Sequence, residues 1–138
     1  MATLTWGPSL KVGFGDIDVQ HRRLVELVNR LEQGIDEGHP HETLSEVLSE
    51  LLRYTKLHFA FEEKLMEQYG LDESGEHHAQ HKRLTDDVFG YLNRFEAGEP
   101  GLETELLQFL GAWLRGHILG TDRDLAARLK AAGADSAA

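Results

Sequence analysis

The sequence predicts an all-α protein: an up-down-up-down antiparallel four-helix bundle with an N-terminal extended arm and a short C-terminal helix. Apolar residues recur at three- and four-residue steps through four long segments, and this spacing places them on one face of an α-helix. Glycine and proline separate the segments after roughly twenty to thirty residues each, which favours a bundle with short turns over one long coiled coil. The length of 138 residues favours a single domain spanning 1–138.

The N-terminal half holds the arm and two of the helices. Residues 1–16 are rich in glycine and are expected to form the extended arm. The first helix is expected over about 18–37, because a Gly-His-Pro turn follows it. The second is expected over about 41–69, since Pro40 suits a first helical turn and Gly70 suits the position just after a C-terminus.

The C-terminal half holds the other two long helices and the tail. A third helix is expected over about 75–96, with Ser74 as its candidate N-cap. A Gly-Glu-Pro-Gly turn separates it from a fourth helix over about 102–119. Gly120 is expected to interrupt the helix there, and a short amphipathic tail helix follows over about 122–131.

Composition excludes several classes of function. A formal net charge of −10 argues against a nucleic-acid partner, because phosphate binding needs clustered lysine and arginine. The chain has no cysteine, which removes disulfides, iron–sulfur clusters and thiolate zinc sites. No apolar run approaches the roughly 20 residues of a membrane span, and the first residues do not resemble a signal peptide. A cytoplasmic location is therefore expected.

Each of the four predicted helices carries a histidine on its apolar face. Residues four apart lie one above the other on a helix, about 6 Å along its axis, so such a pair can reach one metal or two adjacent metals. Two helices carry pairs with this spacing, and the fourth carries a histidine followed five residues later by an aspartate. The candidate metal ligands are His21, His58, Glu62, His77, His81, His117 and Asp122.

Taken singly, these residues also have ordinary structural interpretations. A lone histidine such as His21 is usually a core residue, and His58 with Glu62 is also an ordinary surface pair. Together these interpretations fail, because five imidazoles and two carboxylates would converge in one interior without a lysine or arginine on the same faces. Unpaired buried carboxylates are costly, and a metal ion would neutralise them. The remaining histidines are expected to be exposed: His39, His41 and His78.

Counting ligands predicts two metal ions. Seven ligands are too many for one tetrahedral zinc ion, and calcium and magnesium prefer all-oxygen shells. If Glu62, Asp122 and one solvent oxygen bridge two metals, the five histidines must divide three to two. One metal is then six-coordinate, and the other has one open position. The count permits His77, His81 and His117 on the closed metal and His21 and His58 on the open one. Ligand type alone leaves iron, manganese, copper and zinc as candidates.

One open position favours the binding of one small ligand over hydrolysis. Two ferrous ions can each give one electron, so dioxygen could bind and return unchanged. Apolar residues are expected around the open metal, and none of them can act as a general acid or base. Plain core packing explains the same residues equally well. The expected pocket residues are Leu24, Phe59, Leu114 and Ile118. Trp113 lies one turn before His117 and is expected to orient that ligand.

As a set, these motifs resemble the hemerythrin family, its bacterial branch in particular. The motifs are a lone histidine, then H-x-x-x-E, H-x-x-x-H and H-x-x-x-x-D, with Trp6 and a Gly-Asp-Ile-Asp-Val-Gln lead-in before His21. The resemblance covers roughly residues 4–130, and no ligand position departs from the pattern. It implies an oxo- or hydroxo-bridged centre of two iron ions, bridged by Glu62 and Asp122, with dioxygen bound on the side of His21 and His58.

The leading hypothesis is therefore reversible dioxygen binding by a carrier, storage or delivery protein that is not an enzyme. The alternatives are a di-iron oxidase or peroxidase, an oxygen or iron sensor, and a module in which the metal only stabilises the fold. Oxygen-activating bundles use glutamate-rich shells with E-x-x-H motifs, which this chain lacks. A structural metal site would be closed. The chain is expected to be a monomer, and delivery to an unidentified oxygen-consuming enzyme is conceivable.

Overall fold

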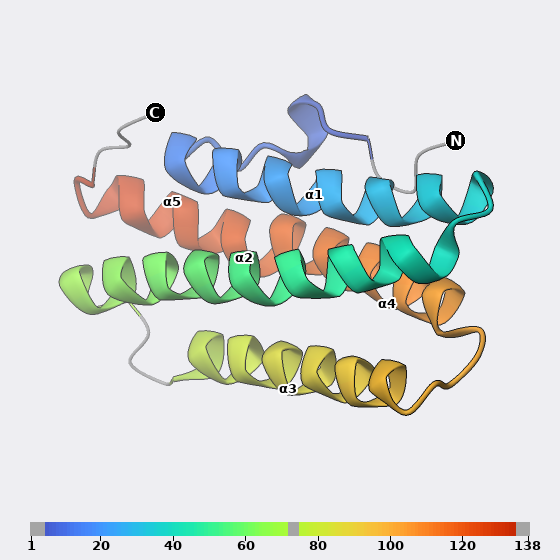
Figure 1. Cartoon of the computed structure of the whole chain (residues 1–138). Helices are drawn as coiled ribbons and strands as arrows, with labels where there is room; N and C mark the ends of the chain where they lie inside the picture. The colour runs from blue at the N-terminus through green and yellow to red at the C-terminus, as the bar shows by residue number, and fades with distance from the viewer. Residues whose placement is uncertain (1–4, 72–74, 135–138) are drawn as a thin grey trace.

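Long antiparallel helices packed side by side make up the protein (Figure 1). The computed structural model describes residues 5–71 and 75–134. The described residues contain no strand, so the predicted all-α bundle is confirmed. The elements are a 3-10 turn η1 (Pro8–Leu10), α1 (Gly15–Asp36), α2 (Pro40–Tyr69), α3 (Glu76–Glu96), α4 (Leu102–Gly116), a π-helical segment η2 (His117–Asp122) and α5 (Arg123–Ala131).

The arm folds back onto the bundle and starts α1 earlier than the sequence predicted. The predicted start was residue 18, whereas the helix begins at Gly15. The side chain of Asp18, in the first turn, accepts hydrogen bonds from the backbone N–H groups of Val12 (2.8 Å) and Gly13 (3.1 Å). A carboxylate there also interacts favourably with the positive end of the helix dipole. This contact fixes the entry of the chain into α1.

The turns at both ends of α2 follow from single residues. Pro40 occupies the first turn of the helix, where its missing N–H costs no hydrogen bond. At the other end, Gly70 has φ +65° and the N–H of Leu71 bonds to the carbonyl of Met66 at 2.9 Å, a pattern that closes helix C-termini. The candidate cap Ser74 lies outside the described residues, and Gly75 is the residue that precedes α3.

The break predicted at Gly120 is absent. Instead, α4 continues through η2 directly into α5, so that helical structure runs from Leu102 to Ala131. Glycine permits a left-handed turn but does not require one, and Gly120 is not among the glycines with positive φ. The π segment absorbs one additional residue without ending the helix.

The core runs the length of the bundle and contains a polar layer. Leucine and valine side chains fill it on both sides of that layer, among them Leu31, Val47 and Leu106, each fully buried. The buried polar and charged residues include five histidines, one glutamate and one aspartate. No helix of the described residues is long and apolar enough to cross a membrane. The fold therefore buries a polar cluster in an otherwise apolar interior, which requires a chemical explanation.

Candidate metal centre

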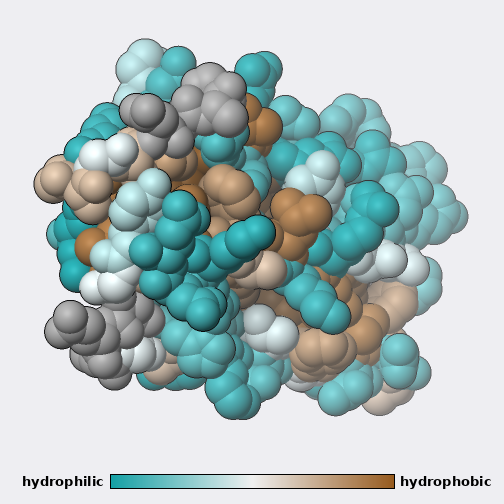
Figure 2. Space-filling view, turned by 90° about the vertical axis from the view of Figure 1, so that its left-hand side faces the viewer, coloured by the Kyte–Doolittle hydropathy of each residue, from teal (hydrophilic) through white to brown (hydrophobic). Residues whose placement is uncertain are grey.

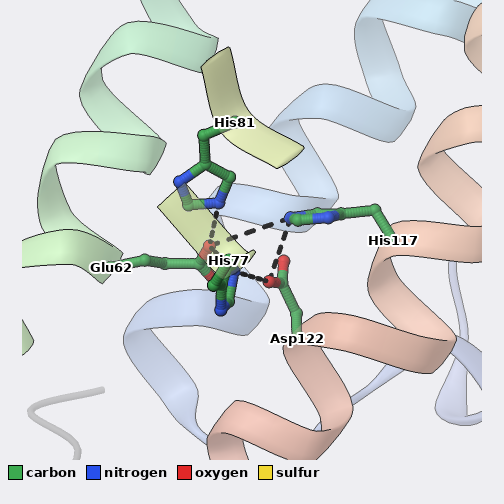
Figure 3. A group of neighbouring side chains, drawn as sticks. All are labelled: Glu62, His77, His81, His117 and Asp122. Atoms are coloured by element: carbon green, nitrogen blue, oxygen red, sulfur yellow. Dashed lines mark hydrogen bonds and ion pairs between the residues drawn. The ribbon is translucent and has the colours of Figure 1, made fainter. Parts of the chain in front are cut away.

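All seven predicted ligand side chains meet inside the bundle. They come from α1, α2, α3 and η2, and each is at most 8% exposed. Figure 3 shows five of them pointing toward one another from three elements. Their ligand atoms form two groups, within each of which all atoms lie within 4.8 Å of one another. The larger group is Glu62, His77, His81, His117 and Asp122, and the smaller group is His21, His58, Glu62 and Asp122.

Helical geometry explains most of this convergence. His58 and Glu62 on α2, like His77 and His81 on α3, lie four residues apart and therefore on one helical face. Five residues separate His117 from Asp122, which would place them about 140° apart around an α-helix. The π segment spans both residues and, with its wider turn, brings the two side chains together: His117 Nε2 lies 3.0 Å from Asp122 Oδ1.

Asp122 divides its two carboxylate oxygens between the two groups. Its Oδ2 lies 2.5 Å from His21 Nε2 and 3.3 Å from His58 Nε2. Its Oδ1 lies 3.2 Å from His77 Nε2 and 3.0 Å from His117 Nε2. One oxygen per group is the arrangement expected of a carboxylate that bridges two metal ions.

Glu62 also belongs to both groups. Its Oε1 lies 3.1 Å from His81 Nε2, 3.4 Å from His77 Nε2 and 3.5 Å from His58 Nε2. Its other oxygen, Oε2, is buried and has no hydrogen-bond partner among the described residues. A buried carboxylate oxygen without a partner is costly, so this atom has an unmet need for a proton or a cation.

Burial shifts the pKa values of the two carboxyl groups in the cluster. Burial raises the pKa of Glu62 well above its usual value, and the nearby Asp122 raises it further. Burial also acts to raise the pKa of Asp122, but close contacts with the imidazoles of His117, His21 and His58 hold it well below the usual value. The two carboxylates thus cannot both be stably ionised without a compensating cation.

The pKa values of the imidazoles shift in opposite directions. Burial lowers the pKa of His58 to about 4 and that of His81 to about 2, where neighbouring histidines add to the effect. Burial also acts to lower the pKa of His117, but its close contacts with the carboxylates of Asp122 and Glu62 outweigh this and raise the value to about 9. The rings of His58 and His81 are therefore neutral and available as ligands, while that of His117 acts as a substitute cation.

The orientation of the atoms fits a shared metal centre. His117 Nε2 and Asp122 Oδ1 are only 3.0 Å apart, yet neither atom makes a hydrogen bond with acceptable geometry. The lone pairs of these two atoms are therefore available to a metal ion placed between the side chains. Nitrogen and oxygen donors of this kind suit iron and other imidazole-binding transition metals. The residues present therefore fit a metal centre with two adjacent ions.

A small apolar cavity lies directly next to the histidine layer. Its volume is about 10 Å³, enough for roughly one water-sized molecule. Four of the lining residues stand one helical turn from a candidate ligand: Leu24 after His21, Thr55 before His58, Leu84 after His81 and Leu114 before His117. The hydroxyl of Thr55 donates to the carbonyl of Leu51 at 2.7 Å, so it presents no free donor to the cavity.

The predicted pocket residues take different places around the site. Leu24 and Leu114 line this cavity, and so does Trp113, whose ring is stacked on His117 with centroids 4.4 Å apart. Phe59 is stacked on His81 of the larger group, with centroids 3.8 Å apart, although its ring also lies 5.8 Å from that of His58. Ile118 is fully buried but does not line the cavity.

Several contacts of the site have no counterpart in the sequence prediction. Thr55 and Leu84 line the cavity, Gln20 contacts His58, and Glu63 contacts His81. Thr55 and Leu84 could have been predicted, because each lies one helical turn from a ligand. Nothing in the sequence pattern marks Gln20 or Glu63. The three histidines excluded as ligands are all exposed, as predicted: His39, His41 and His78.

Comparisons with known proteins agree with this site. Residues 12–129 match the family model described as the Hemerythrin HHE cation binding domain. The chain is 39% identical over 131 residues to a bacteriohemerythrin of Stenotrophomonas maltophilia, covering 95% of this chain and 84% of that protein. It is 42% identical over 122 residues to a bacteriohemerythrin of Pseudomonas aeruginosa, covering 88% and 78%. A crystal structure of a hemerythrin mutant superposes with a TM-score of 0.83 at 26% identity, covering 92% of this chain and 97% of that one.

The fold and the site define a helical bundle that holds a cluster of histidine and carboxylate metal ligands. The chain belongs to the hemerythrin family. Hemerythrin domains bind a di-iron centre, and the cluster of histidine, glutamate and aspartate side chains suits such a centre. Members of the family are mainly oxygen binders, so the class of function is di-iron oxygen binding or a related role.

Proposed function

We propose that this chain binds dioxygen reversibly at a di-iron centre and acts as an oxygen carrier, storage or delivery protein rather than as an enzyme. The proposed iron ligands are those of the two groups, with Glu62 and Asp122 as bridges. A di-iron centre, when bound, supplies the two electrons that reversible dioxygen binding needs. The observation that carries the proposal is the division of the oxygens of Asp122 between three-histidine and two-histidine groups.

This division supports binding at one side only. With shared bridges, the three-histidine group provides one more protein ligand than the two-histidine group. The side of His21 and His58 is then the one with room for a small molecule. A closed structural metal site would not leave such a position.

The surroundings support binding without onward chemistry. The cavity beside the histidine layer is lined by leucine, valine and tryptophan, together with one threonine whose hydroxyl is already bonded. Leu24 and Leu114 exclude water there, and no lining residue is a general acid or base. A bound oxygen species would therefore lack a nearby proton donor, which disfavours its release as a reduced product.

The decisive experiment is an oxygenation cycle. Protein loaded anaerobically with ferrous iron is expected to contain two irons per chain and to develop a visible charge-transfer band in air. The band should disappear on deoxygenation and return over repeated cycles. As a matched pair, His58→Ala should abolish the cycle, whereas His39→Ala, which removes an exposed histidine outside the cluster, should leave it intact.

Other outcomes would contradict the proposal in distinct ways. One zinc per chain would exclude a di-iron centre. Irreversible bleaching, or steady consumption of oxygen with an added reductant, would favour a di-iron oxidase or peroxidase. A reversible cycle with no such consumption would support the carrier.

We also propose that the protein is a monomer. The large hydrophobic residues that are markedly exposed among the described residues are separated in the chain: Val19, Leu57 and Phe89. Hydrophilic residues cover most of the end of the molecule seen in Figure 2, with hydrophobic areas broken up between them. Stable interfaces usually bury about 800 Å² on each partner. Sedimentation at micromolar concentration is expected to give the mass of one chain, and a dimer would contradict this.

A further inference from the structure

Behind His81, on the side away from the cluster, lies the side chain of Glu63. The Nδ1 atom of His81 is 3.2 Å from Oε2 of Glu63, while the Nε2 atom of the same ring faces Glu62 at 3.1 Å. Glu62 and Glu63 are neighbours on α2 but point to opposite ends of one imidazole on α3. His81 is 2% exposed and Glu63 is 31% exposed, so Glu63 lies at the boundary between the site and solvent.

This contact decides which nitrogen of His81 is available to a metal. When Nε2 binds a metal ion, the proton of the neutral ring must lie on Nδ1, where the carboxylate of Glu63 accepts it. The Nε2 lone pair is then directed into the cluster, and the negative charge behind the ring makes that lone pair a stronger donor. Among the described residues, Glu63 is the hydrogen-bond partner of His81 Nδ1 that holds the ring in this tautomer.

Glu63 is itself held from the other side. Its Oε1 atom contacts Nδ1 of His78, a residue on α3 that is 63% exposed. The three residues form a continuous line from the surface to the cluster, His78 to Glu63 to His81. All three line a cleft of about 880 Å³ between α2 and α3. The line fixes the position of the Glu63 carboxylate although it is partly exposed to water.

The two-histidine group has a corresponding contact of different charge. The Nδ1 atom of His58 lies 2.6 Å from Oε1 of Gln20, a neutral amide on α1. His81 is therefore oriented from behind by a carboxylate on the three-histidine side, and His58 by an amide on the two-histidine side. The negative charge of Glu63 lies on the side with more protein ligands.

We propose that Glu63 is a positioning residue of the metal centre, which orients His81 and strengthens its bond to the metal of the three-histidine group. The inference rests on the ligand set of the proposed function. It adds to that set a residue, Glu63, that does not bind the metal itself but contacts a ligand. Partners of this kind typically change metal affinity by about 10- to 100-fold.

The test compares three variants loaded with ferrous iron. Glu63→Ala removes both the acceptor and the charge, and Glu63→Gln keeps an acceptor oxygen without the charge. Glu67→Ala is the matched control, since it removes an exposed glutamate one turn further along α2. The first measurement is the rate of iron release to a ferrous chelator. The second is the reduction potential, and the third is the denaturant midpoint of each protein with and without iron.

Glu63→Ala is expected to release iron roughly 10- to 100-fold faster than the unaltered protein, with the metal-free midpoint unchanged. Glu63→Gln should release iron more slowly than Glu63→Ala. Its potential should rise, because removal of a nearby negative charge favours the ferrous state. Release from Glu67→Ala should match the unaltered protein.

Release from Glu63→Ala at the control rate would overturn the inference. So would an equal loss of stability in metal-free and loaded Glu63→Ala, which would indicate a structural role only. If Glu63→Ala fails to fold, Glu63→Gln decides: an unchanged potential and release rate would overturn the proposal. If the unaltered protein binds no iron, both the proposed function and this inference are wrong. If the oxygenation cycle works but the Glu63 variants match the unaltered protein in iron release and potential, only this inference is wrong.

Discussion

At the scale of single residues, the cluster is a set of groups that burial makes unfavourable unless a cation joins them. Glu62 and Asp122 are fully buried, and no lysine or arginine contacts either side chain among the described residues. Burial of charge without a partner is among the most costly arrangements in a protein interior. Protonation would meet this cost if no cation were bound: burial and the nearby Asp122 raise the pKa of Glu62, and the contacts with both carboxylates raise the pKa of His117.

This balance predicts that Glu62→Gln has little effect on the stability of the metal-free protein and a large effect on that of the iron-loaded protein. In the metal-free protein, a neutral amide of the same shape replaces a carboxyl that burial already holds protonated, so the free energy of unfolding should change by less than about 1 kcal/mol. In the iron-loaded protein, the amide cannot serve as an anionic bridge, and the stabilisation by iron should be lost. Thermal unfolding with and without iron measures both effects. An iron-loaded variant as stable as the unaltered protein would exclude Glu62 as a bridge.

A second residue-scale prediction concerns Leu114, which is 4% exposed and lines the cavity beside His117. Leu114→Ala should enlarge the cavity, admit water to the two-histidine side and accelerate loss of the oxygenated form. It should also cost about 2–5 kcal/mol of stability. The autoxidation rate is read from the decay of the charge-transfer band.

Leu106→Ala is the control for Leu114→Ala. Leu106 is fully buried on the same helix but lies outside the cavity, so its truncation should cost similar stability without changing the autoxidation rate. Equal autoxidation rates in the two variants would remove Leu114 from the pocket that protects bound oxygen.

At the scale of elements, the helices were predictable because each buries one apolar face. The recurrence of leucine, valine and histidine at helical spacing located all four long helices, and turn residues such as Pro40 and Gly70 located the boundaries of α2. The π segment was not predictable from that spacing. The sequence predicted a break there because of Gly120, whereas the five-residue interval between His117 and Asp122 is accommodated by the wider π turn.

The seven residues of the cluster could be predicted from the sequence, but the groups behind them could not. Histidine on an apolar face is unusual and therefore informative. Glutamate or glutamine beside that face is ordinary, because most such residues are solvated. Gln20 and Glu63 lie next to ligands in sequence, yet only the packing of α1 on α2, and of α2 on α3, determines that they contact His58 and His81.

The close contact of α1 and α2 gives a prediction at this scale. Gly34 lies against Thr43, and an added Cβ would come within 2.4 Å of the Thr43 Cβ and 2.1 Å of its Oγ1. Thr43 cannot easily move, because its hydroxyl donates to the carbonyl of His39 at 2.7 Å. Gly34→Ala should therefore force the helices apart and lower the free energy of unfolding by about 1–3 kcal/mol.

Gly90, within α3, is the matched glycine. An added Cβ there meets nothing within 4 Å, and Gly90→Ala should raise stability by about 0.5–1 kcal/mol through helix propensity alone. Denaturant unfolding of the two variants measures the difference. Stabilisation by both substitutions would show that the contact at Gly34 is looser than the structure indicates.

At the scale of the whole molecule, the cluster joins elements that are distant in sequence. Its side chains come from α1, α2, α3 and the π segment that links α4 to α5. A metal held by all of them would connect the four long helical runs, which lie alongside one another in Figure 1. Folding and metal binding should therefore be coupled across the entire chain.

Removal of iron tests this coupling. Leucines and valines on both sides of the polar layer make up most of the core, so chelated protein should keep its helical circular dichroism. Its stability should fall by about 4 kcal/mol relative to protein with free iron at 1,000 times the dissociation constant, which for a chain of this length corresponds to a fall in Tm of roughly 10 °C. Hydrogen exchange should accelerate around the ligands in all four helical runs together, since each run contributes at least one ligand. Faster exchange confined to one helix would mean that the metal is held locally, and an unchanged Tm would mean that the centre contributes nothing to the fold.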